Sequence, residues 1–278
     1  MRVVALGGGH GLAASLRAIR NYADEISAIV SVADDGGSSG VLRNLLGVAP
    51  PGDLRKCLVA LAPDDSLWKE ALEYRFTDDH PLGNLLIVGL TQVGNLQRAL
   101  DEIGKMIGAA GRVLAATAQP VVLCAVTTSG IVRGQVEIGK HRDISRVFIE
   151  PVHAEVDSLV TDAILSADQL VIGPGSLFTS VLAVMSIPDV SQAYKSSNAH
   201  KIFVCNLRPQ INETSDFDLG RHLRALGEHG VEVDTVLWDP SEMPLGSPAG
   251  PQVIQCDLAG CGGLHDSDRL ARYLCDLV

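Results

Sequence analysis

The stretch LGGGHGLAASLRAI, residues 6–19, places four glycines and a histidine between an apolar run and a segment with helical spacing of its apolar residues. A strand, a glycine turn and a helix in this order can bind phosphate, because missing side chains let a ligand approach the backbone and the helix N-terminus presents unpaired N–H groups. Residues 9–14 also match the pattern G-x-G-x-x-A. A plain strand-to-helix turn without a ligand is the alternative. We predict a nucleotide site at Gly7, Gly8, Gly9, His10 and Gly11.

Short runs rich in branched residues alternate with helical segments along the chain, which is typical of a mostly parallel sheet covered by helices. The predicted strands are residues 2–6, 26–32, 113–117, 121–127, 146–151, 170–173, 201–207 and 233–238. Residues 239–252 are predicted to form a loop rich in proline, glycine and serine. We expect one Rossmann-like α/β domain over residues 1–278, with helices on both faces of the sheet and a helical insertion at about 53–111, rather than two independent domains.

The composition is that of a globular chain of 278 residues, 46% of them hydrophobic, with a formal net charge of −11. The acidic balance argues against nucleic acid as a partner, since binding its backbone needs clustered Lys and Arg. The first apolar run is too short for a signal peptide, and no stretch approaches the roughly 18 apolar residues of a membrane span. The six cysteines are scattered without the spacing of a metal site. We expect a cytoplasmic protein with reduced core thiols.

The segment VADDGGSSG, residues 32–40, follows the second predicted strand. Its Asp34 lies 20 positions after Ala14, where a dinucleotide-binding fold places the residue that binds ribose. Glycine N–H groups and serine hydroxyls can converge on an anion, whereas the adjacent carboxylates Asp34 and Asp35 can bind sugar hydroxyls or a divalent cation. The alternative is a glycine/serine loop that only caps a strand. The predicted ligand contacts are Asp34, Asp35, Gly36, Gly37, Ser38 and Ser39.

Two predicted helix starts carry further polar residues. In PPGDLRKCL, residues 50–58, Asp53 stands where a helix N-cap belongs and Arg55 lies in the first turn. The helix dipole disfavours an arginine there unless an anion is near, so Arg55 is predicted to face a ligand. In LGNLLIVGL, residues 82–90, Asn84 lies at the head of an apolar helix and is either a cap or a ligand contact.

The second half of the chain repeats the arrangement of strand, glycine turn and helix in LVIGPGSLFTSVLAV, residues 170–184. Gly173 and Gly175 form the turn, and Ser176 stands at a natural N-cap. Two such turns suit a ligand with two ends. The segment VCNLRPQINET, residues 204–214, then ends another strand with Asn206 and Arg208, at the sheet edge where α/β folds bind ligands.

These motifs, taken together and in this order, resemble the successive sequence blocks of the YvcK-type gluconeogenesis factors, a family of the CofD-like superfamily. The resemblance covers almost the whole chain and implies a Rossmann-like α/β fold. It also implies binding of UDP-sugars such as UDP-N-acetylglucosamine, no established catalytic reaction, and support of cell-wall synthesis and cell shape on gluconeogenic carbon. The family usually has threonine where this chain has His10, and often a proline and a polar residue where it has Ala183 and Val184. A ligand contact at Val184 is therefore not carried over.

Two other activities compete with this interpretation. The enzyme branch of the superfamily, the phospholactate transferases, moves a phospholactyl group from an activated nucleotide to a deazaflavin and needs a metal and a carboxylate, for which Asp34 and Asp35 are candidates. An NAD-dependent dehydrogenase would account for G-x-G-x-x-A and Asp34, but the remaining chain offers no evident acid/base constellation.

We therefore expect a cytoplasmic, nucleotide-sugar-binding regulatory protein rather than a transferase, with no catalytic residue assigned and no cofactor required beyond the nucleotide ligand. A UDP-sugar is favoured as that ligand over NAD. Residues 7–11 and 173–176 would bind phosphates, Asp34 and Asp35 hydroxyls or a cation, and Ser38 and Ser39 would add donors. Arg55 and Arg208 would neutralise charge. The protein partner, in cell-wall synthesis or signalling, is unidentified, and a homo-oligomer is an open alternative.

Overall fold

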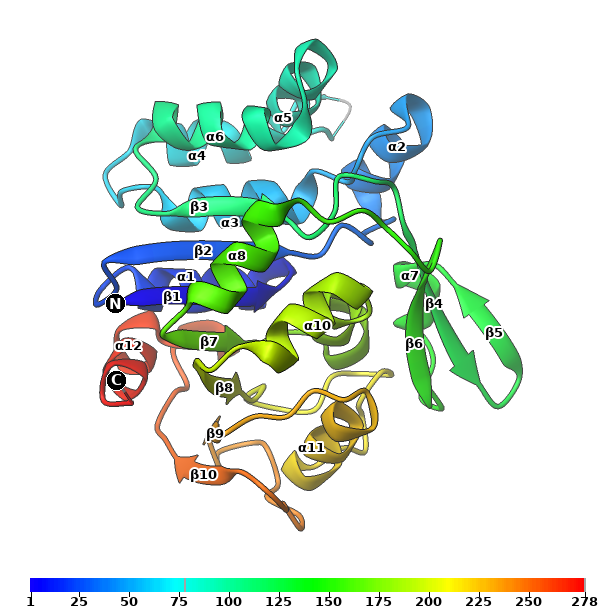
Figure 1. The fold of residues 1–278 in the computed structure, drawn as a ribbon, viewed down its shortest axis with the longest axis vertical. Coiled ribbons are helices and arrows are strands. Elements are labelled where there is room, and N and C mark those ends of the chain that lie inside the picture. Colours follow the sequence, from blue (N-terminus) through cyan, green and yellow to red (C-terminus); the bar gives the residue numbers. More distant parts are fainter. Residues whose placement is uncertain (78, 278) are drawn as a thin grey trace.

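A seven-stranded sheet forms the centre of the computed structural model, which describes residues 1–77 and 79–277 (Figure 1). Its strand order is β10-β9-β8-β7-β1-β2-β3, and every neighbouring pair is parallel. Strand β7 is buried at every position, which explains its continuous run of apolar residues. The strands of this sheet are β1 Arg2–Gly7, β2 Glu25–Val30, β3 Arg112–Ala115, β7 Gln169–Ile172, β8 His200–Val204, β9 Thr235–Trp238 and β10 Gln252–Gln255.

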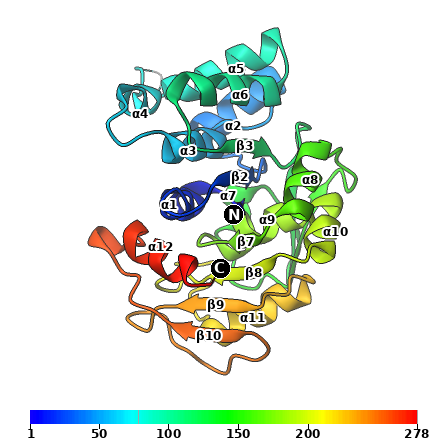
Figure 2. The ribbon, with the colours of Figure 1, turned by 60° about the vertical axis from the view of Figure 1, so that its left-hand side comes forward.

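Helices cover both faces of this sheet, as the sequence predicts. Figure 2 shows α1 and α12 on one side of the sheet and α8, α9 and α10 on the other. Helix α1 begins directly after β1 and packs against both α3 and α12. The helices of these layers are α1 Gly9–Ile19, α3 Gly52–Leu61, α8 Ser158–Ser166, α9 Leu182–Met185, α10 Pro188–Ser196, α11 Leu219–Glu228 and α12 Ser267–Cys275, with the short turns η1 Leu177–Val181 and η2 Cys261–Gly263.

The predicted helical insertion between β2 and β3 is confirmed. It comprises α3 together with α4 Leu67–Glu73, α5 Leu82–Val93 and α6 Leu96–Ile107. An additional helix, α2 Gly37–Leu46, begins inside the segment 32–40 that was predicted to supply ligand contacts. Helices α4, α5 and α6 lie beyond the β3 edge of the sheet, whereas α3 also packs against β2 and β3 (Figure 2). The insertion therefore closes one end of the sheet and contributes one of its covering helices.

A second, three-stranded antiparallel sheet in the order β5-β4-β6 stands beside the main one (Figure 1). The strands predicted at 121–127 and 146–151 belong to this sheet, as β4 Val122–Thr127 and β6 Arg146–Glu150, rather than to the parallel one. Strand β5 Gly130–Arg133 and strand β10 were not predicted. Both are short edge strands with mostly exposed side chains, so they lack the apolar run that marks a buried strand. Helix α7 Gln135–Ile138 follows β5.

Apolar side chains from β1, β2 and β7 fill the centre of the molecule, where Leu6, Ile29 and Ile172 are fully buried. Within the described residues, no helix has both the length and the apolar character required to cross a membrane.

Candidate functional site

The two glycine turns predicted from the sequence meet at the carboxyl ends of the neighbouring strands β1 and β7. A Cβ atom on Gly11 would lie 2.1 Å from the carbonyl oxygen of Pro174, and the Ser15 hydroxyl donates to the carbonyl oxygen of Gly173 at 2.6 Å. The chain leaves β1 toward β2 on one side and β7 toward β8 on the other. Such a reversal of strand order is the topological switch point at which open α/β sheets bind ligands.

The first turn leaves the start of α1 open to an anion. Gly8 is the N-cap and has no side chain to cap the helix. Across residues 1–77 and 79–277, the N–H groups of Gly9, His10 and Gly11 donate to no protein acceptor. Gly9 has a φ of 66°, a conformation that favours glycine. Unpaired N–H groups and the helix dipole together attract an anion to this end of α1.

Helix α3 brings Asp53 beside this turn, but Asp53 is not the helix cap that the sequence suggests. The helix begins at Gly52 after Pro51, and the Ser39 hydroxyl accepts the hydrogen bond of the Gly52 N–H at 3.1 Å. Asp53 is instead 5% exposed, and its carboxylate accepts from the Lys56 ammonium at 3.0 Å. The two prolines before Gly52 set the backbone for the helix start, so the N-cap is Pro51, two residues before the predicted cap Asp53.

Arg55 is a buried cation with little compensating charge. The residue is 6% exposed; its Nε donates to Asn84 Oδ1 at 3.1 Å and its Nη1 to Glu73 Oε1 at 3.4 Å. The Glu73 side chain is 56% exposed, so solvent screens its attraction for the guanidinium. Burial, which outweighs the attraction of Glu73, lowers the pKa of Arg55 from its ordinary value.

Asn84 is a partner of Arg55 rather than a helix cap, because α5 begins at Leu82 and Pro81 is its N-cap. Its amide nitrogen donates to the Ser38 hydroxyl at 3.0 Å, and Ser38 Oγ lies 2.8 Å from His80 Nδ1. The predicted residues Ser38, Arg55 and Asn84 thus form one hydrogen-bonded chain, which links α2, α3 and α5. Sequence analysis did not identify His80, which lies in a loop without a motif.

Asp34 and Asp35, adjacent in sequence, contact different parts of the molecule. Asp34 accepts from the Gly36 N–H at 3.0 Å, and its pKa is raised by burial and by the nearby Asp53 charge. Asp35 accepts from the Val136 N–H at 2.9 Å and so ties the loop to α7 of the small sheet. Among the residues that the structure describes, no group of three or more His, Cys, Asp or Glu is arranged to hold a metal ion.

The second turn differs from the first because several of its polar groups are bonded to side chains of the protein. Asn206 accepts from the Gly175 N–H and donates to the Gly175 carbonyl oxygen, each at 2.9 Å. Gln210 Nε2 donates to the Ser176 hydroxyl at 3.0 Å. Glu213, a residue that sequence analysis quoted without assigning a role, accepts from the backbone N–H groups that follow Ser176. The Gly173 and Gly175 N–H groups and the Ser176 hydroxyl therefore already have protein partners, whereas the N–H groups of Ser176 and Leu177 donate to no acceptor among the described residues.

Two further predicted residues, His10 and Arg208, have different neighbours. His10 is exposed at the start of α1, and partial desolvation and the charges of Lys56 and Arg55 lower its pKa. Arg208 lies away from the Arg55 chain: its Nη1 is 3.7 Å from Glu242 Oε2, and its guanidinium contacts the position of Gly263 in the C-terminal region. Arg208 is thus placed beside loops after β9 and β10 rather than beside the first glycine turn.

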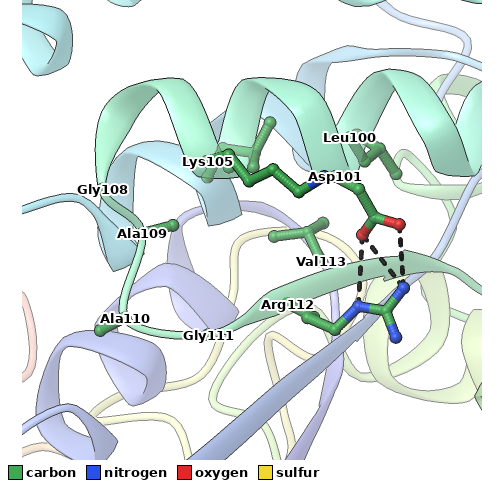
Figure 3. Close-up of a pocket in the computed structure, with 11 residues that line it drawn as sticks. Leu100, Asp101, Lys105, Gly108, Ala109, Ala110, Gly111, Arg112 and Val113 are labelled. Carbon is green, nitrogen blue, oxygen red and sulfur yellow. Dashed lines mark hydrogen bonds and ion pairs between the residues drawn. The ribbon is translucent and has the colours of Figure 1, made fainter.

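A pocket of about 450 Å³ lies at the amino-terminal end of strand β3 (Figure 3). It is lined by the end of α6 and the start of β3, and Asp101 pairs with Arg112 at 2.9 Å beside it. Because the strands are parallel, their amino ends lie together, and the glycine turns follow the opposite, carboxyl ends of β1 and β7. This pocket is not part of the candidate site.

The fold and the two glycine turns at its switch point define a Rossmann-like α/β protein of the CofD class. The family model described as 2-phospho-L-lactate transferase CofD matches residues 3–250. A crystal structure of a UPF0052 family protein from Bacillus halodurans superposes with a TM-score of 0.92 at 33% identity, covering 98% of both chains.

Two curated relatives specify the family further, and both names contain the words gluconeogenesis factor. The relative from Mycobacterium tuberculosis is 41% identical over an alignment of 308 residues, which covers 98% of this chain and 89% of the relative. The relative from Halalkalibacterium halodurans is 41% identical over 245 residues, covering 84% of this chain and 76% of the relative. The chain belongs to the YvcK-type gluconeogenesis factor family within the CofD-like superfamily.

Proposed function

We propose that this protein is a regulatory protein that binds a nucleotide sugar of the UDP-N-acetylglucosamine type. The observation that supports this most is the burial of Arg55, whose ion pair among the described residues is with a solvent-screened carboxylate, Glu73. A buried, under-compensated charge is costly unless a partner of opposite charge completes it. The phosphates of a ligand would supply that partner, and Lys56 lies in the same helix at the same end.

Different groups of the protein would bind the phosphate oxygens and the sugar hydroxyls of the ligand. The unpaired N–H groups at residues 9–11 would donate to phosphate oxygens, with Gly7 and Gly8 leaving room for the approach. Asp34, Ser38 and Ser39 would contact sugar hydroxyls, because carboxylates accept hydrogen bonds and hydroxyls both donate and accept them. Asp35 and Gly36–Gly37 would hold this loop against α7 and at the start of α2.

The regulatory part of the proposal is supported by the relatives that carry the words gluconeogenesis factor in their names. A regulator of this kind would pass the state of the site to another protein, in cell-wall synthesis or signalling. Helix α2 begins in the candidate site and ends on an exposed surface that includes Leu45 and Leu46. Ordering of α2 by a ligand would therefore change a surface that a partner can reach.

Ligand identity can be tested by thermal unfolding. UDP-N-acetylglucosamine at 100 times its dissociation constant is expected to add about 2.7 kcal/mol to the free energy of unfolding. UMP at the same concentration is expected to add less, because it lacks the second phosphate and the sugar. Differential scanning calorimetry with each nucleotide measures both effects. A clear shift with NAD and none with any UDP-sugar would replace the proposal by dinucleotide binding.

The transferase is a second candidate, favoured by the description of the matching family model. Asp34→Asn distinguishes it from a binder, because the substitution removes the partly buried charge but keeps the size of the side chain. For a binder, the variant is expected to bind a UDP-sugar about tenfold more weakly, and neither protein should release GMP from a guanosine-diphospholactate donor in the presence of a deazaflavin. GMP release by the parent that disappears in Asp34→Asn would establish the transferase instead.

A further inference from the structure

The helix that follows the second glycine turn begins on a carboxylate from the protein itself. Glu213 is 4% exposed and accepts from the Phe178 N–H at 2.6 Å, the Thr179 N–H at 3.0 Å and the Thr179 hydroxyl at 3.0 Å. Among the described residues, Glu213 forms no ion pair with a cation. Its negative charge is thus compensated only by helix N–H groups and one hydroxyl, which are the donors that a phosphate would use at such a turn.

Apart from Ser15, which donates to the Gly173 carbonyl oxygen, one loop supplies the side chains that hold the second turn. Asn206 binds both backbone polar groups of Gly175, Gln210 binds the Ser176 hydroxyl, and Glu213 binds the N–H groups of Phe178 and Thr179. The spacing N-x₃-Q-x₂-E places these side chains in the order of the backbone groups that they contact. Among the hydrogen bonds of the described residues, no set of side chains binds the first turn in this way.

The two turns also touch each other through their backbones. A Cβ on Gly11 would meet the carbonyl oxygen of Pro174, and a Cβ on Gly175 would lie 3.8 Å from the carbonyl oxygen of Gly8. Displacement of the second turn would therefore displace the first one, because close-packed backbone groups cannot move independently.

We infer that Glu213 is an internal anion that fills the phosphate position of the second turn, so that the diphosphate of the ligand binds only at the start of α1. The part of the inference that concerns where the diphosphate binds rests on the proposed function. The part that concerns the role of the Glu213 carboxylate does not. Glu213 is a positioning residue. It holds the second turn, and the backbone of the second turn packs against Gly8 and Gly11 of the first turn.

The carboxylate position can be tested without the ligand. Glu213→Ala leaves two buried N–H groups and a hydroxyl unpaired, so we expect the melting temperature to fall by about 6 °C or more. Formate, a free carboxylate small enough for the space, is expected to restore part of this loss relative to chloride at equal ionic strength. The parent protein should show no such difference. A folded Glu213→Ala variant without a formate-specific gain would overturn the assignment.

Glu213→Gln is the conservative control, because its amide oxygen can still accept from both N–H groups and the Thr179 hydroxyl can turn to accept from the amide nitrogen. Its melting temperature is expected to stay within about 3 °C of the parent value. A loss as large as that of Glu213→Ala would contradict the inference, since the acceptor geometry would then not explain the role of Glu213. This variant keeps the test decisive when Glu213→Ala fails to fold.

The ligand part uses the folded Glu213→Gln variant in a calorimetric titration with UDP-N-acetylglucosamine. An affinity within about threefold of the parent value is expected, because no phosphate approaches residue 213. An affinity gain of about tenfold or more would overturn the inference, since it would mean that a ligand phosphate had been repelled by the native carboxylate. If the parent itself binds no UDP-sugar, the proposed function fails, whereas the formate experiment still decides the role of Glu213.

Discussion

Arg55→Met is expected to weaken the binding of UDP-N-acetylglucosamine by about 100-fold or more, equivalent to about 2.7 kcal/mol. A ligand phosphate that loses a desolvated guanidinium keeps the cost of its own burial, which is why the expected loss exceeds that of a surface charge. Stability should change little or rise by about 1 kcal/mol, because methionine fills a similar space without the cost of a buried cation. The two effects thus have opposite signs.

Isothermal titration and thermal unfolding of the same preparation measure both effects. Arg98→Met is the matched control: Arg98 is an exposed arginine on α6, where the same substitution should leave affinity and melting temperature unchanged. If Arg55→Met bound the nucleotide sugar as tightly as the parent, the phosphates would lie elsewhere. The burial of Arg55 would then have to be explained by Asn84 and Glu73 alone.

Gly11→Ala is expected to destabilise the fold by about 3 kcal/mol or more, because the new methyl group enters the backbone of the second turn. The added Cβ would lie 2.1 Å from the carbonyl oxygen of Pro174, 2.6 Å from its carbonyl carbon and 2.9 Å from Gly175 Cα. No side chain can rotate away to relieve these contacts. The corresponding fall in melting temperature, measured by circular dichroism, is about 6–12 °C.

Gly89→Ala gives the comparison for this prediction. Gly89 is also a helical glycine, but it is exposed and a Cβ there would have no neighbour within 4 Å. Alanine should raise stability by about 0.5–1 kcal/mol, because it lowers the entropy of the unfolded chain and favours the helix. Equal effects of the two substitutions, or an unchanged melting temperature for Gly11→Ala, would disprove the contact between the two glycine turns.

The α/β class could be predicted because local periodicity records burial. The runs that became β1, β2, β7 and β8 are apolar because both faces of a parallel strand are covered, and the four helices at 52–107 carry helical spacing. Strands β5 and β10 escaped prediction because exposed edge strands need no apolar run. Nor does periodicity distinguish β4 and β6 from strands of the main sheet, since it reports which side chains are buried but not which strand is the neighbour.

The residue types of the candidate site could be predicted from the sequence, but the contacts between these residues could be predicted only in part. Glycines, serines and carboxylates next to strand ends indicate a ligand turn whatever their distant contacts. The prediction of Asp53 as a helix cap was wrong, and so was the cap alternative for Asn84. A cap is decided by where the helix begins, and these helices begin directly after Pro51 and Pro81. The ligand contacts themselves remain predictions.

The sequence by itself determined the order of the buried strands and of most helices, the two glycine turns and the polar residues next to them. Only the tertiary structure decided that side chains of the protein bind the second turn and the helix start after it, whereas none of the described side chains binds the first turn. Glu213 lies 35 residues from Phe178, and Arg55 lies 29 residues from Asn84, yet each pair is hydrogen-bonded. The physical reason is that burial and charge compensation depend on groups brought together from distant segments, whereas sequence patterns report only the neighbours within a turn or a strand.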